Sequence, residues 1–138
     1  KGNATSIIQN YQSDKLNLTD SLETDKLAKL SSSYDIGFLP MPNSKVWRLA
    51  SPLKRSEYLA SGMIVLGINH SGHRMEESGD WLQLFAEDNF VEASVSAIKK
   101  LETIKLRELQ NSARLFAESN LDWSKSVDIL DGLLSKQS

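Results

Sequence analysis

Cysteine is absent from the 138 residues of this chain, and proline and glycine are scarce, at three and seven residues. The missing cysteine excludes disulfide bonds and thiolate metal sites. Long apolar runs are also lacking: the longest, Met63–Leu66, is far below the roughly 20 residues of a membrane-spanning helix. No signal peptide is visible, so the sequence predicts a cytoplasmic protein.

Three well-known sequence motifs are missing as well. No G-x-G-x-x-G occurs, which argues against a dinucleotide-dependent dehydrogenase, and no G-x-x-x-x-G-K-[ST] occurs, which argues against a P-loop enzyme. The G-x-S-x-G turn that carries the nucleophile of many hydrolases is absent too.

Charge is unevenly distributed along the chain. The whole chain carries a net charge of −2, whereas Ile36–Met75 contains five lysines and arginines and a single acid. Both histidines, His70 and His73, lie in the same window. A basic island in an acidic chain favours a site for a bound anion. A nucleic-acid-binding surface is less favoured, because it usually makes the whole domain basic. The alternative is a chance cluster of solvated charges.

Hydrophobic periodicity predicts alternating helices and strands. Helices are expected at Thr5–Gln12, Glu23–Ser32, Ser51–Gly62, Phe90–Leu101, Thr103–Glu118 and Trp123–Leu134. Strands are expected at Lys15–Leu22, Tyr34–Pro40, Met63–Ile68 and Trp81–Phe85. This order predicts an α/β fold: a Rossmann-like, mainly parallel sheet with helices on both faces. The chain then forms one domain over residues 1–138, on which the helices of residues 90–138 pack.

In such folds ligands bind where the carboxyl ends of the strands meet helix N-termini. The segments expected at this edge are Pro40–Ser51, which contains the loop Met41–Ala50, and Asn69–Arg74, both in the basic window. Ser51 suits the N-cap of the following helix and Pro52 its first turn, whereas Gly62 suits its left-handed end. The free N–H groups of this helix favour an anion such as phosphate.

Two charged side chains share one face of that helix. Lys54 lies in the first turn, and Glu57 follows three residues later, one turn deeper. A cation can bind phosphate, and a carboxylate can accept hydrogen bonds from two vicinal hydroxyl groups, as on a ribose. The pattern fits a nucleotide site, and it fits a surface salt bridge equally well.

The segment Ser51–Gly62 resembles the signature S-P-x-K-x-x-E-Y-x-A-x-G of retaining family-four glycosyltransferases. The preceding Asp35–Pro42 is similar to the D-I-G-L-x-P-x-P element of that family, and Gly72–Arg74 with Glu76 is similar to its G-x-R-E turn. Asp122–Ser124 resembles the aromatic turn before its last helix. The resemblance implies part of the C-terminal, nucleotide-sugar-binding domain of the GT-B fold.

The resemblance also implies roles for particular residues. Glu57 would bind the ribose hydroxyls of the donor, and Ser51, Pro52 and Lys54 would lie against its ribose and phosphates. The implied activity is transfer of a hexose-type sugar from a nucleoside-diphosphate sugar to an acceptor, in glycan or cell-envelope polysaccharide synthesis. No metal or other cofactor is implied, and no catalytic residue is assigned.

Three further residues are weaker candidates. Charge and position suggest Arg48 and Arg74 as phosphate contacts, while His73 is either a contact to the sugar or diphosphate or a surface residue. Leu49 stands where many members of the family carry a second glutamate, so the role of that glutamate is vacant here.

Two parts of the family's proteins have no counterpart in this sequence. The front β-α units, with their glycine-rich strand end and diphosphate-gripping basic pair, are not found before Leu16, nor is the acceptor-binding N-terminal domain. The chain is therefore expected to be an inactive fragment of a longer enzyme, whose missing part would make any contact with the inner face of a membrane. Alternatives are a GT-B sugar-nucleotide epimerase, a non-catalytic nucleotide- or phosphate-binding domain, and an interaction domain for an acidic partner.

Overall fold

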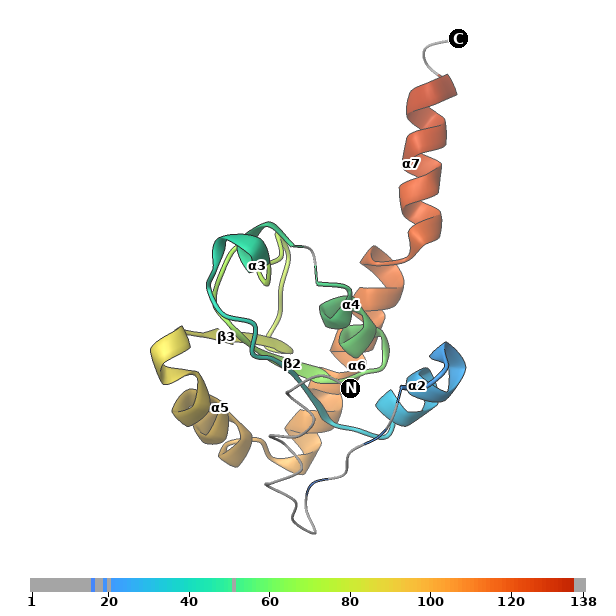
Figure 1. Cartoon of the computed structure of the whole chain (residues 1–138). Helices are drawn as coiled ribbons and strands as arrows, with labels where there is room; N and C mark the ends of the chain where they lie inside the picture. The colour runs from blue at the N-terminus through green and yellow to red at the C-terminus, as the bar shows by residue number, and fades with distance from the viewer. Residues whose placement is uncertain (1–15, 17–18, 20, 51, 136–138) are drawn as a thin grey trace.

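The computed structural model describes residues 16, 19, 21–50 and 52–135. Its centre is a parallel sheet of three strands in the order β1-β2-β3 (Figure 1). The strands are β1 (Ile36–Leu39), β2 (Ile64–Ile68) and β3 (Leu82–Phe85). Their register pairs Ile36 with Ile64 and Val65 with Leu82. The predicted α/β class with a parallel sheet is therefore confirmed.

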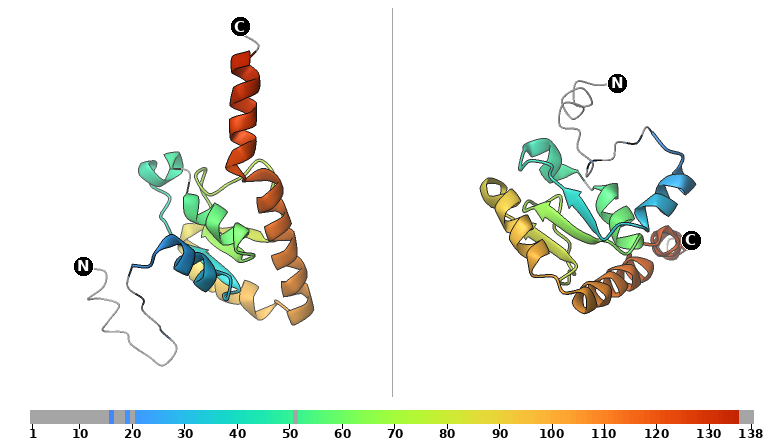
Figure 2. Two further views of the ribbon diagram at one scale, coloured as in Figure 1. Left: turned by 90° about the vertical axis from the view of Figure 1, so that its right-hand side faces the viewer. Right: turned by 90° about the horizontal axis from the view of Figure 1, so that it is seen from below.

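Helices precede, connect and follow these strands. They are α2 (Thr24–Ser31), α3 (Lys45–Leu49), α4 (Leu53–Ala60), α5 (Phe90–Lys99), α6 (Thr103–Asn120) and α7 (Trp123–Ser135), with a short 3-10 helix, η1 (Glu87–Asn89), before α5. α4 and α6 cover one face of the sheet and α5 covers the other (Figure 2). This arrangement confirms the prediction of helices on both faces.

The apolar composition of β2 explains its central position. All five of its residues are buried, because helices cover both faces of the sheet and neighbouring strands cover both edges of β2. On one face Val65 belongs to a core cluster with Leu59 of α4 and Ala113 of α6. On the other face the ring of Phe38 in β1 meets Phe90 of α5 edge to face, with ring centroids 6.4 Å apart.

A tight turn connects α4 to β2. Gly62 has φ of +76°, a left-handed conformation that glycine adopts without the steric penalty of a Cβ atom. The Gly62 N–H donates to the Leu59 carbonyl and the Met63 N–H to the Tyr58 carbonyl, each at 2.9 Å. These two bonds form a Schellman motif, which ends the helix where the sequence predicts.

Two predicted elements near the start of the chain lie wholly or partly outside the described residues. The helix expected at Thr5–Gln12 lies outside them entirely. The strand expected at residues 15–22 is only partly described, and its described positions, 16, 19, 21 and 22, are not in a strand. The alternation of leucines and polar residues predicts this strand. Such a pattern indicates that one face of a segment is buried, but it does not supply a neighbouring strand to pair with.

The loop expected at Met41–Ala50 contains α3. The turn-forming residues stand before this helix, and its first backbone bond runs from the Arg48 N–H to the Ser44 carbonyl at 2.9 Å. At the start of α4, Pro52 occupies the N-cap position predicted for Ser51, and Ser51 itself lies outside the described residues.

α7 differs from the expectation that all helices of residues 90–138 pack on the domain. α5 and α6 do pack, whereas α7 extends away from the sheet and its covering helices (Figures 1 and 2). Its Trp123, Val127, Leu130 and Leu134 recur at helical spacing and are all more than half exposed. The predicted helix is confirmed, but the buried face that its periodicity predicts has no cover among the described residues.

Candidate functional site

The carboxyl ends of β1 and β2 bring the two expected segments together. β1 leads through α3 to the start of α4, and β2 leads into the turn of residues 69–74. The Ser71 hydroxyl of this turn donates to the Arg48 carbonyl of α3 at 2.8 Å. Gly72 lies so close to α3 that an added Cβ atom would overlap the carbonyl oxygens of Trp47 and Ala50.

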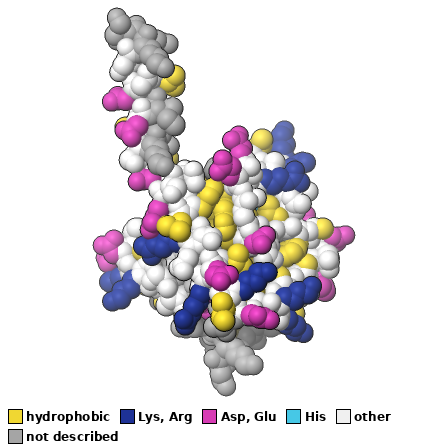
Figure 3. Space-filling model, turned by 180° about the vertical axis from the view of Figure 1, so that it is seen from behind, with side chains coloured by type: hydrophobic (Ala, Val, Ile, Leu, Met, Phe, Trp, Pro, Cys, Tyr) yellow, Lys and Arg dark blue, Asp and Glu magenta, His cyan; other side chains and the backbone are white. Residues whose placement is uncertain are grey.

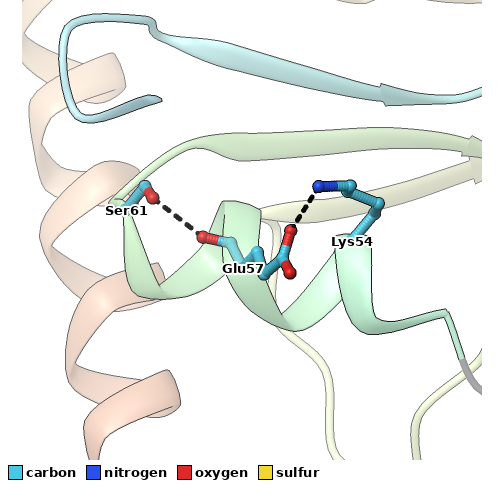
Figure 4. A network of polar contacts seen from close by, with 3 residues as sticks. All are labelled: Lys54, Glu57 and Ser61. Carbon is cyan, nitrogen blue, oxygen red and sulfur yellow. Dashed lines mark hydrogen bonds and ion pairs between the residues drawn. The ribbon is translucent and has the colours of Figure 1, made fainter. Parts of the chain in front are cut away.

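Lys54 and Glu57 form the exposed pair that their spacing predicts. The Lys54 Nζ atom donates to Glu57 Oε2 at 2.7 Å, and each side chain is 52% exposed (Figure 4). The Glu57 carbonyl accepts a hydrogen bond at 2.9 Å from the hydroxyl of Ser61, which caps the end of α4. The carboxylate is thus held beside a cation at the start of the helix and remains open to solvent.

Two grooves adjoin the Glu57 side chain. One, of about 370 Å³, lies between α2, α4 and α6 and is lined by Leu27, Ser32 and Arg114 among others. The second, of about 530 Å³, lies between α4, the end of α6 and the start of α7, where Trp123 forms part of the wall. Among the described residues Lys54 lines neither of these two grooves, although it is bonded to Glu57, which lines both.

The two weaker basic candidates lie on other segments of the same edge. Arg48 belongs to the last turn of α3 and is exposed. Arg74 is exposed too, and its Nε donates to Asn69 Oδ1 at 2.8 Å across the turn. Within the described residues no hydrogen bond or ion pair joins either arginine to Lys54 or Glu57.

His73 is placed differently from both readings of the sequence. It is only 1% exposed, so it is neither a surface residue nor open to a sugar in this conformation. Its Nδ1 donates to the Ile68 carbonyl at 2.7 Å. Its ring lies against that of His70, with centroids 3.8 Å apart and planes tilted by 36°, and His70 Nε2 donates to the Met41 carbonyl at 3.2 Å.

Burial lowers the pKa of His73, and the nearby positive charge of Arg55 and the neighbouring His70 act in the same direction. The hydrogen bond to Ile68 opposes this shift. Because a carbonyl oxygen only accepts, the neutral ring carries its hydrogen on Nδ1. His73 therefore stabilises the end of β2 as a neutral donor.

On the face seen from behind, acidic and basic side chains are interspersed among apolar ones and no histidine is visible (Figure 3).

Arg55 is the important residue that the sequence analysis missed. It counts among the five cations of the basic window, yet it is 9% exposed and its Nη1 donates to the Gly72, His73 and Arg74 carbonyls at 3.2, 2.9 and 2.8 Å. A signal was available: Arg55 precedes the buried Leu59 by four residues and so shares its inward face. The exposed basic island is correspondingly smaller than the count suggests.

No protein-family model matches this chain, and no curated protein or solved structure matches it significantly. The resemblance to family-four glycosyltransferases accordingly stays a prediction. In the part of the chain that the structure describes, no helix combines the length and apolarity needed to cross a bilayer. The same residues contain no group of three histidine or acidic side chains arranged to hold a metal ion.

Proposed function

We propose that this chain binds the donor in a retaining glycosyltransferase, which moves a hexose-type sugar from a nucleoside-diphosphate sugar to an acceptor. The observation that carries the proposal is the exposed pair of Lys54 and Glu57, 2.7 Å apart in the first turns of α4. The resemblance of Ser51–Gly62 to the family signature supplies the substrate class.

The pair suits a ligand that carries both charge and hydroxyl groups. Lys54 and Glu57 are separated by about 4.5 Å along the axis of an α-helix, which places them beside adjacent groups of one ligand. In the proposal Lys54 binds a phosphate of the nucleotide and Glu57 accepts hydrogen bonds from both ribose hydroxyls. The amide groups at the start of α4 add a favourable dipole for the same phosphate.

A ligand that replaces the contact between Lys54 and Glu57 would sacrifice little free energy. Exposed ion pairs typically contribute less than about 1 kcal/mol to stability, because water solvates both partners. Both side chains are half exposed, so neither is locked in a buried network. The two charges are therefore available to exchange their mutual contact for contacts with a nucleotide.

Binding and orientation of the donor are the tasks that we assign to this chain. In the transfer step the bond between the sugar and the nucleoside diphosphate breaks, and a bond from the same carbon to an acceptor oxygen forms. Orientation lowers the barrier for such a step, provided that the acceptor is held in the matching position. In the proposed enzyme, the groups that hold the acceptor and those that stabilise the transition state lie outside residues 1–138.

Titration calorimetry of the chain with UDP, GDP and ADP tests the proposal. At least one nucleotide should bind, and Glu57→Ala should weaken it by roughly 10- to 100-fold, the effect of losing hydrogen bonds to a charged group. Pyrophosphate, which has no ribose, should bind equally weakly to wild type and Glu57→Ala.

The matched control is another exposed i,i+3 pair. Lys26 Nζ lies 3.2 Å from Glu23 Oε2 next to α2, with both side chains more exposed than those of Lys54 and Glu57. Glu23→Ala should leave nucleotide affinity unchanged. The proposal fails if none of the three nucleotides binds, or if Glu57→Ala and Glu23→Ala have the same affinity.

A further inference from the structure

The turn Gly72–Arg74 is held by one side chain from another element. Arg55 of α4 donates from a single guanidinium nitrogen to three consecutive backbone carbonyls, those of residues 72, 73 and 74, at 2.8–3.2 Å. Consecutive carbonyls meet at one point only when the backbone curls around it. The shape of this turn is therefore tied to the position of Arg55.

Arg55 does this without an acidic partner. No ion pair involves it among the described residues, and its Nε is buried without a hydrogen bond there. Burial of a guanidinium without a carboxylate is costly, and the dipoles of the three carbonyls are what offsets the cost. Removing the side chain would leave these carbonyls without their donor.

A second element, α3, also contacts this turn. The contact of Gly72 with the Trp47 and Ala50 carbonyls and the hydrogen bond from Ser71 to Arg48 both connect it to α3. The turn thus lies between α3 and α4, at the edge of the sheet where α4 begins. Lys54 directly precedes Arg55. The first helical turn of α4 therefore carries an exposed cation, Lys54, next to the buried Arg55 that binds residues 72–74.

We propose that Arg55 is a positioning residue, which holds the turn Gly72–Arg74 so that the exposed Arg74 can act with Lys54 on the phosphates of a bound nucleotide. The inference rests on the proposed function for its ligand, whereas the fixing of the turn rests on the contacts of Arg55 alone. It assigns Arg74 a place in the site that depends on a buried residue of α4.

Limited proteolysis tests the fixing of the turn without any ligand. Trypsin cleaves after arginine, so cleavage after the exposed Arg74 reports opening of the turn, and cleavage after Arg107 in α6 reports opening elsewhere. Arg55→Met should raise the first rate about tenfold relative to the second, and Arg55→Lys, which keeps a donor, should raise it less. Leu82→Ala, a core truncation in β3, is the control and should raise both rates together. Equal acceleration at both sites in Arg55→Met would overturn the inference.

A double-mutant cycle with nucleotide affinity tests the link to Arg74. Arg55→Met should weaken the best-binding nucleotide about tenfold in the wild-type background, the size of one charge-assisted contact, and by less than about twofold in the Arg74→Gln background. A purely structural effect would give the same loss in both backgrounds, and that result would overturn the inference. If Arg55→Met does not fold, Arg55→Lys replaces it in the cycle. If wild type binds no nucleotide, the proposed function fails, and proteolysis alone decides whether Arg55 fixes the turn.

Discussion

At the scale of single residues, the end of β2 is surrounded by ionisable side chains in the interior. Arg55, His70 and His73 are all buried, and no carboxylate pairs with them among the described residues. A guanidinium keeps its proton at any physiological pH, so Arg55 is a fixed positive charge. The lowered pKa of His73 avoids a second charge beside it. In this buried region the charged Arg55 thus lies near a His73 ring that stays neutral.

This depressed pKa predicts how stability changes with pH. The unfolded chain binds a proton at His73 with a pKa near 6.5, and the folded chain binds it only at lower pH. The unfolded state therefore gains protons first, and the stability present above about pH 6.5 is lost as the pH falls through the folded-state value. One such group changes the free energy of unfolding by at most about 1.4 kcal/mol per pH unit.

Urea unfolding at several pH values between 8 and 5 measures this effect. His73→Asn keeps an N–H donor for the Ile68 carbonyl but has no group that titrates in this range. The difference in unfolding free energy between wild type and His73→Asn should shrink as the pH falls. Parallel curves for the two proteins would show that the buried imidazole does not cause the pH dependence.

At the scale of secondary-structure elements, two glycines provide a matched comparison. A Cβ atom at Gly62 would meet only the Gln110 carbonyl, at an ordinary 3.7 Å, so the cost of Gly62→Ala comes from its left-handed backbone. That cost is about 1–2 kcal/mol. A Cβ atom at Gly132, inside α7, would touch nothing within 4 Å, and alanine favours a helix there by up to about 1 kcal/mol.

Chemical denaturation of both variants checks the prediction. Gly62→Ala should lower the free energy of unfolding, and Gly132→Ala should leave it unchanged or raise it slightly. Hydrogen exchange of the α7 amides should slow in Gly132→Ala only. Equal destabilisation by the two substitutions would mean that the left-handed turn after α4 does not limit stability.

Elements with their own local signal could be predicted from the sequence, and those defined by distant partners could not. The apolar run of β2 and the glycine at the end of α4 each determine their structure within a few residues. The i,i+3 spacing likewise predicts the contact between Lys54 and Glu57. The turn Gly72–Arg74 depends on Arg55 and on α3, which are far away in sequence, and no local pattern reports such contacts. The burial of His73 has the same origin.

At the scale of the whole molecule, stability is concentrated around β2. The core cluster draws on β1, α4, β2, β3 and α6, and none of its members among the described side chains belongs to α7. The apolar side chains of α7 whose burial the structure describes, such as Trp123, Val127 and Leu130, are exposed and bury little surface. The helix therefore adds length to the molecule without adding to its central core.

Removal of α7 should consequently change stability very little. A chain that ends at Asp122 should keep its melting temperature within about 3 °C, which corresponds to less than about 1 kcal/mol in a domain of this size. Leu59→Ala is the contrasting variant, because Leu59 is fully buried and its truncation should cost about 2–5 kcal/mol. Differential scanning calorimetry compares the two. A large drop on shortening would show that α7 stabilises the domain through contacts of Trp123 with α4.

The position of β2 in the middle of the sheet has a consequence for the time course of synthesis. Its neighbours come from before and after it in the chain, and the helix that completes its cover next to α4 is α6, which ends at Asn120. Parallel strand pairs form slowly, because their partners are separated by long stretches of chain. While a ribosome is still producing the second half of the protein, Ile64, Val65 and Leu66 have no complete cover. A chaperone that shields short apolar segments would therefore act on nascent chains that have passed β2 but not yet released α6.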